Sequence, residues 1–182
     1  MSDLVIDLRR ARNLAELAHT DVGQRYGEGP YTVHLDAVRS VAFEFGIVDP
    51  AILVATLLHD VIEDTKTTRE QIEGIFGTRV ADLVDAVTDP PGHPNRKTRK
   101  AASYPRILAV PGATKLKLAD RIANVRSCWA VATAGAKRSK SLLGMYKREY
   151  GGFRKALRPE REIDPVEVAM WNELDRLLAW RP

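Results

Sequence analysis

The side chains best suited to chemistry lie in one short stretch, in which His59 and Asp60 are followed by Glu63 and Asp64. The preceding residues form the most apolar segment of the chain, and ionised groups at the end of such a helix are costly unless they are paired or bind a metal ion. Imidazole and carboxylate together suit Mn²⁺, Fe²⁺ or Zn²⁺. The stretch therefore predicts a metal site. The alternative interpretation is a buried histidine followed by solvated acids.

The spacing of these residues divides them into two pairs. Glu63 follows His59 by four residues and Asp64 follows Asp60 by four, so each pair shares a face if the helix continues that far. Carboxylates beside a metal ion can take a proton from an attacking water molecule. Because neighbouring acids titrate as a coupled set, the sequence does not assign the base to one of them, with a slight preference for Glu63.

Two further residues complete an ordered pattern along the chain. His34 lies early in a predicted helix, and Asp120 lies in the apolar-flanked stretch Lys117–Asn124. Each is unremarkable alone. Together with His59 and Asp60 they form the ordered set H…HD…D.

This ordered set resembles the HD phosphohydrolase superfamily, and within it the hydrolase domain of the RelA/SpoT family, especially the free-standing small alarmone hydrolases. The HD pair alone is weak evidence, but four family stretches occur in the expected order. They are the loop Gly27–Tyr31, the run LLHDxxEDT at Leu57–Thr65, the run FGxxVxxLVxxVT at Phe76–Thr88, and the run KLADRxxNxR at Lys117–Arg126.

The resemblance implies a reaction and a set of catalytic residues. Family members of this kind remove the 3′-pyrophosphate of guanosine 3′,5′-bispyrophosphate (ppGpp, or pppGpp), releasing GDP or GTP and pyrophosphate, and typically use one Mn²⁺ ion. Glu63 and Asp64 would be catalytic, because they would position and activate water. The implied metal ligands are His34, His59, Asp60 and Asp120.

Substrate-binding residues follow from the same resemblance. Arg25 is the candidate to stack on guanine, since its guanidinium is planar. Asn124 lies one turn beyond Asp120, and Tyr146 matches a family tyrosine near the ribose. A cluster of basic residues is a candidate binding site for pyrophosphate; it contains Arg96, Lys97, Arg99 and Lys100. Within this cluster, Arg96 and Lys97 are predicted to bind substrate. A solvated basic face is the alternative for this cluster.

Two other functions remain open at this stage. One is an HD phosphohydrolase for another nucleotide, such as an enzyme that removes the 2′-phosphate of NADPH. The other is a nucleotide sensor without catalysis, for which loss of a ligand or of the Glu63–Asp64 pair would be expected. All of these residues are present.

The elements that must position these residues are helices. Apolar residues recur with helical spacing in Leu4–Ala18, and a second helix is expected over Thr32–Phe45. Asp49 and Pro50 have the types of an N-cap and first helical residue, and Thr67 with Glu70 has capping-box spacing. We expect no strand. The predicted fold is an all-α, HD-type orthogonal bundle forming a single domain over 1–182, with a motif-bearing core at about 15–150 and a C-terminal helix at about 164–180.

Composition limits the partners and the compartment. The chain has 182 residues, of which 45% are hydrophobic and 29% charged, and its net charge of +4 suits an anionic small molecule without requiring nucleic acid. The single cysteine, Cys128, excludes an intrachain disulfide and favours a reducing cytoplasm. No segment resembles a signal peptide or a membrane span, and no synthetase domain accompanies the motifs. The oligomeric state is not predicted.

Overall fold

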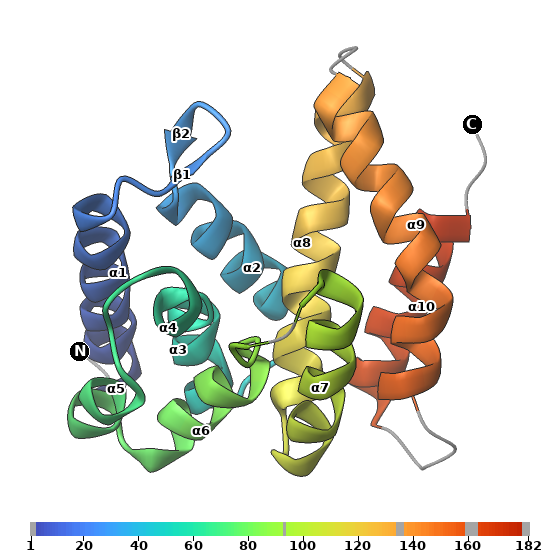
Figure 1. Ribbon diagram of the computed structural model, residues 1–182. Coiled ribbons are helices and arrows are strands. Elements are labelled where there is room, and N and C mark those ends of the chain that lie inside the picture. Colours follow the sequence, from blue (N-terminus) through green and yellow to red (C-terminus); the bar gives the residue numbers. More distant parts are fainter. Residues whose placement is uncertain (1–2, 93, 134–136, 159–163, 180–182) are drawn as a thin grey trace.

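The computed structural model describes residues 3–92, 94–133, 137–158 and 164–179, and these are overwhelmingly helical (Figure 1). The all-α prediction is therefore confirmed. None of the described helices is both long enough and apolar enough to span a membrane. In chain order the helices are α1 (Asp3–Asp21), α2 (Thr32–Glu44), α3 (Pro50–Leu58), α4 (Val61–Asp64), α5 (Arg69–Phe76), α6 (Thr78–Val87), α7 (Arg96–Ala109), α8 (Ala113–Thr133), α9 (Lys137–Leu157) and α10 (Pro165–Ala179).

A small hairpin between α1 and α2 corrects the expectation that the chain has no strand. Strand β1 (Arg25–Tyr26) pairs antiparallel with β2 (Gly29–Pro30). The chain reverses at Gly27, whose φ of +60° favours glycine. Strands of two residues leave no alternation to detect, so periodicity could not have predicted them.

Helix α3 is the buried centre of the fold. The predicted N-cap is confirmed, because Asp49 Oδ1 accepts a hydrogen bond from the backbone N of Ala51 at 2.9 Å. Leu53, Leu57 and Leu58 are at most 2% exposed. Helices α1, α2, α6 and α8 all pack against α3. The carboxyl end of α3 is thus held on several sides, and the HD pair follows directly.

The helix breaks at the HD pair instead of continuing through Asp64. Helix α3 ends at Leu58, Asp60 has φ −106° and ψ −4°, and α4 begins at Val61. Glu63 and Asp64 therefore lie on a separate short helix, although Asp64 N still donates to Asp60 O at 2.9 Å.

The capping box before α5 lies one residue later than predicted. Thr68, not Thr67, is the N-cap, and its partner in the capping box is Gln71. Thr67 is occupied elsewhere, because its backbone N and its hydroxyl both contact Thr65 Oγ1, at 3.1 and 3.0 Å.

Helix α8 connects the two sides of the molecule. It packs against α2 on one side and against α9 and α10 on the other (Figure 1). Arg126 reinforces both contacts, donating to Glu44 on α2 at 2.6 Å and to Glu173 on α10 at 2.8 Å. The predicted C-terminal helix is α10, while residue 180 lies outside the described residues.

Candidate active site

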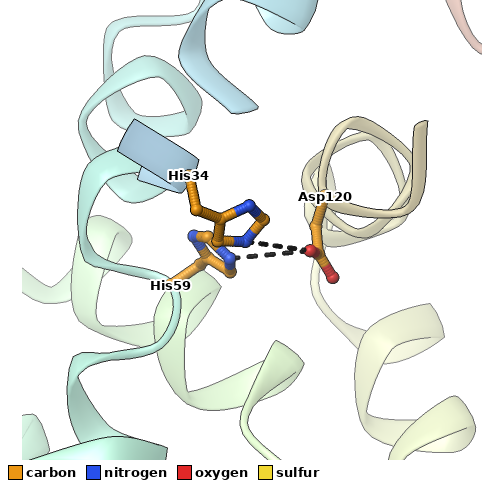
Figure 2. A group of neighbouring side chains, drawn as sticks. All are labelled: His34, His59 and Asp120. Atoms are coloured by element: carbon orange, nitrogen blue, oxygen red, sulfur yellow. Dashed lines mark ion pairs between the residues drawn. The ribbon is translucent and has the colours of Figure 1, made fainter. Parts of the chain in front are cut away.

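Three of the predicted metal ligands converge from separate elements. His34 comes from the first turn of α2, His59 follows α3, and Asp120 lies in the middle of α8 (Figure 2). One ligand atom of each lies within 4.8 Å of the others. Asp120 Oδ1 is 3.4 Å from His34 Nε2 and 3.7 Å from His59 Nε2. Two imidazole nitrogens and a carboxylate oxygen thus face one point.

The fourth predicted ligand, Asp60, lies against the same two rings. Its Oδ2 atom is 2.9 Å from His59 Nε2 and 3.6 Å from His34 Nε2. The hydroxyl of Tyr31 donates a hydrogen bond to the same oxygen at 2.5 Å. Tyr31 therefore fixes the orientation of the Asp60 carboxylate.

His59 is oriented to bind a cation. His59 Nδ1 lies 2.9 Å from Thr56 O and can donate its proton to that oxygen, so Nε2 is the ring nitrogen that faces the carboxylates of Asp60 and Asp120. Among the described residues, buried His59 Nε2 makes no hydrogen bond of good geometry, although Asp60 Oδ2 lies 2.9 Å from it. A nitrogen of this kind beside carboxylate oxygens fits a divalent transition metal ion.

The charges at this point also favour a cation. Burial lowers the pKa of His59, but Asp60 and Asp120 outweigh it and raise that pKa to about 10. Burial raises the pKa of Asp120, but Lys117 and the two histidines hold it well below its usual value. The carboxylates remain ionised and attract positive charge to the ring nitrogens, as a proton or as a metal ion.

Glu63 and Asp64 line the pocket beside the triad, and each is oriented by a donor. Glu63 Oε2 accepts from the backbone N of Asp89 at 3.1 Å, and Asp64 Oδ2 accepts from Gln24 Nε2 at 3.1 Å. Burial, then repulsion from Asp60 and Glu63, raises the pKa of Asp64 to about 6. Both carboxylates therefore line the same pocket as the converging histidines and aspartates, each in a defined orientation.

Asp120 is held from both sides along α8. Lys117 Nζ donates to Oδ2 at 2.8 Å, and Asn124 Nδ2 donates to Oδ1 at 2.5 Å. Tyr26 donates in turn to Asn124 Oδ1 at 3.3 Å and stacks on the ring of His34, with centroids 4.9 Å apart. The β1–β2 hairpin is therefore tied to two of the converging side chains.

The pocket over these residues has a volume of about 170 Å³ and an almost entirely polar lining. Four cationic side chains reach it from α7 and α8, so that carboxylates and cations share the walls. The lining residues that donate positive charge are Arg96, Lys100, Lys117 and Arg121. Such a pocket suits an anion bound beside a metal ion.

Comparison with known proteins decides the family. The sequence profile of the HD domain matches residues 11–146, most of the chain. The chain belongs to the HD domain family. The predicted family resemblance is thus confirmed.

Several relatives of this HD domain are named as hydrolases of guanosine-3′,5′-bis(diphosphate). It is 35% identical over 128 residues to the human guanosine-3′,5′-bis(diphosphate) 3′-pyrophosphohydrolase MESH1, a match covering 69% of this chain and 72% of that protein. It is 37% identical over 127 residues to the corresponding hydrolase of Aquifex aeolicus, covering 68% of this chain. That match spans only 18% of the Aquifex protein.

A solved structure extends the similarity to the fold. Described as a metazoan ortholog of SpoT that hydrolyzes ppGpp, it superposes with a TM-score of 0.69 at 26% identity. The match covers 93% of this HD domain and 94% of that chain.

The predicted substrate-binding residues are distributed unevenly in the HD domain. Arg96, Asn124 and Tyr146 line the pocket. Lys97 is exposed and does not line it, because it lies a helical step of about 100° from Arg96. Arg25 is also exposed and outside the lining, and its guanidinium donates to Glu28 O within the hairpin.

Sequence reasoning missed several residues that orient the site. Tyr31 and Lys117 each contact a predicted ligand, and Gln24 contacts Asp64. A signal existed for Tyr31 and Lys117, which lie within the motif stretches. Gln24 directly precedes Arg25, yet nothing local indicates that it reaches a residue on α4.

Proposed function

We propose that this chain is a metal-dependent hydrolase that removes the 3′-pyrophosphate of ppGpp or pppGpp. The convergence of His34, His59 and Asp120 beside Glu63 and Asp64 carries this proposal. It is supported by relatives named for the same reaction and by a solved fold described as hydrolysing ppGpp. The nucleotide substrate and the single cysteine are consistent with work in the cytoplasm.

The proposed ion is Mn²⁺, held by His34, His59, Asp60 and Asp120. Mixed nitrogen and oxygen donors support this choice over Mg²⁺, which prefers oxygen ligands and retains several waters. When bound, a divalent ion supplies Lewis-acid chemistry, because it neutralises phosphoryl oxygens and acidifies water.

The chain's own residues position the reactants. Glu63 and Asp64 orient a water molecule toward the phosphorus attached to the 3′-oxygen and take up its proton. The water oxygen forms a bond to that phosphorus, the bond from phosphorus to the 3′-oxygen breaks, and the 3′-oxygen gains a proton. GDP and intact pyrophosphate are the products. Gln24 and the backbone N of Asp89 keep the two carboxylates in place.

The remaining phosphates face the cationic wall. Arg96 and Lys100 lie one helical turn apart on α7 and both line the pocket. Burial lowers the pKa of Lys100, and nearby Lys117 adds to this effect, whereas Asp89 at 2.8 Å favours the charged form. Asn124, Tyr146 and Arg25 complete the proposed nucleoside site, with Arg25 at the hairpin outside the pocket lining.

Product analysis tests the reaction. Purified protein is incubated with ppGpp, pppGpp or NADPH, with chelator and after Mn²⁺ is restored, and products are separated by ion-exchange chromatography. We expect GDP and pyrophosphate from ppGpp only when the ion is present. Orthophosphate as the main early product from ppGpp, or rapid NADPH dephosphorylation without ppGpp cleavage, would overturn the alarmone assignment. Failure on all three substrates would favour a nucleotide sensor.

A further inference from the structure

Two arginines of the pocket share one carboxylate that lies behind them. Glu149 on α9 accepts hydrogen bonds from Arg96 Nε at 2.7 Å and Arg96 Nη2 at 3.3 Å, and from Arg121 Nη1 at 3.5 Å. Arg96 and Arg121 line the pocket, whereas Glu149 does not. Helices α7, α8 and α9 pack against one another (Figure 1), and these hydrogen bonds join all three through Glu149.

The side chain of Arg121 is buried and packed between aromatic rings. Its side chain is 4% exposed, and its guanidinium lies 4.7 Å from the ring centre of Tyr146 and 4.5 Å from that of Phe153. Aromatic faces attract the charge, but a guanidinium this deeply buried also needs an anionic partner. Glu149 supplies that partner.

Arg96 depends on Glu149 for a different reason. It is the first residue of α7 and its side chain is 38% exposed, so solvent competes for it. A positive charge at a helix N-terminus is also unfavourable. The two-pronged contact with Glu149 offsets this and keeps the guanidinium at the pocket wall.

The group formed by Arg96, Arg121 and Glu149 carries a net positive charge. Burial raises the pKa of Glu149, but Arg96 and Arg121 outweigh burial and hold it below its ordinary value. One ionised carboxylate between two guanidinium groups leaves a net positive charge. Contacts with Glu149 use two N–H groups of Arg96, so others remain for a ligand. The junction therefore suits an anion with several oxygens.

We propose that Glu149 is a positioning residue that holds Arg96 and Arg121 together as an anion subsite for phosphate groups of the substrate. The inference rests on the proposed function for the identity of that substrate. Glu149 acts through the arginines and does not contact the reacting atoms. Phosphates bound by a preset arginine pair are held about equally in the ground state and the transition state, so Glu149 should govern KM more than kcat.

Glu149→Gln tests the proposal because it keeps the side-chain shape and removes the charge. We expect KM for ppGpp to rise roughly tenfold while kcat changes less than about twofold. The matched control is Glu173→Gln, whose carboxylate contacts Arg126 and Arg176 on α8 and α10, outside the pocket. An unchanged or lower KM in Glu149→Gln, or an equal rise in the control, overturns the proposal.

Binding of inorganic pyrophosphate supplies a readout independent of turnover. Calorimetry should show a dissociation constant roughly tenfold larger for Glu149→Gln than for the unaltered protein. If the protein does not cleave ppGpp, the proposed function fails, yet pyrophosphate binding still decides the role of Glu149. Unaltered affinity in the variant contradicts that role.

A double variant shows whether Glu149 acts through Arg96. Residues that work as one unit give non-additive effects. In an Arg96→Ala background, adding Glu149→Gln should therefore weaken pyrophosphate binding much less than it does alone. Full additivity contradicts the proposal. If Glu149→Gln fails to fold by circular dichroism, Arg96→Ala alone carries the test, and pyrophosphate affinity unchanged by it is the contradicting result.

Discussion

Gln24 reaches Asp64 across forty residues of sequence, with Nε2 donating to Oδ2 at 3.1 Å. The backbone N of Gln24 donates to His19 O at 2.9 Å, which ties the residue to the end of α1. Asp64 ends the four-residue helix α4, and so short a helix has little stability of its own. The orientation of the Asp64 carboxylate, one of the two proposed catalytic groups, therefore depends on a segment between α1 and β1.

Replacing Gln24 should slow the reaction without emptying the metal site. In Gln24→Ala the Asp64 carboxylate loses a donor, and we expect kcat to fall by roughly tenfold through lost orientation. Steady-state kinetics with ppGpp and metal analysis by mass spectrometry measure both quantities. Gln71→Ala, which removes an exposed amide at the start of α5, is the control and should leave kcat unchanged. Unaltered turnover in Gln24→Ala would contradict the orientation argument.

Removing a carboxylate ligand should abolish metal binding. Asp60→Ala and Asp120→Ala each leave fewer donors at the ring nitrogens, so the approximately one equivalent of Mn²⁺ expected for this site should be lost. Asp36→Ala is the control, because Asp36 lies on α2 near His34 but pairs with Arg12 and Arg39 instead. If Asp120→Ala keeps the Mn²⁺ content of the unaltered protein, the assignment of Asp120 as a ligand is wrong.

Substitution of Glu63 or Asp64 should lower turnover without removing the metal ion. Glu63→Gln and Asp64→Asn preserve shape and remove charge, and positioned acid–base groups typically contribute roughly 10²–10⁴ to the rate. Turnover should fall on that scale while Mn²⁺ and pyrophosphate still bind. Loss of the ion together with activity would mean that these side chains are ligands.

Asp64→Asn should also make the metal-free protein more stable at neutral pH. Because the pKa of Asp64 is raised from 3.8 to about 6 in the fold, the folded state binds more protons than the unfolded state between these values. Stability contributed by this group is present at lower pH and is lost as the pH rises through about 6. Thermal unfolding in chelator should show a higher Tm for the variant at pH 7 and little difference near pH 4. The opposite order at pH 7 would contradict the raised pKa.

Arg126 should matter for stability and not for catalysis. Although it belongs to the same motif as Asp120, it connects α2 and α10 through Glu44 and Glu173. Because these pairs are partly exposed, Arg126→Ala should cost about 1 kcal/mol of unfolding free energy. Denaturant unfolding measures that loss, and metal content and kcat serve as the internal control. A large drop in kcat at unaltered stability would place Arg126 in the site instead.

Sequence reasoning predicted that His59, Asp60 and Asp120 would act together, because they lie in local motifs of distinctive chemistry. His59 and Asp60 follow the most apolar helix, and Asp120 lies in the KLADR run, so residue types and order identify them. The helix break after Leu58 was not predictable in the same way, since neither glycine nor proline marks it.

The sequence did not predict residues whose position depends on where a helix begins or on contacts between distant helices. Lys97 was predicted to bind substrate, but in the structure Lys100 lines the pocket and Lys97 does not. Which lysine faces the pocket depends on where α7 begins, directly after the N-cap Asn95. In the sequence, Glu149 is one acidic residue in a basic helix. Its contacts with Arg96 on α7 and Arg121 on α8 appear only in the folded structure. A single sequence gives no signal for contacts between residues so far apart.

The proposed metal site also has a consequence for stability. An ion bound by the proposed ligands His34, His59 and Asp120 would connect three segments that are distant along the chain. Such a connection would span two long loops of the chain, one between His34 and His59 and one between His59 and Asp120. An ion that binds only the folded state raises the free energy of unfolding with its own concentration. The supply of that ion would then govern how long the molecule resists proteolysis, as well as how fast it turns over.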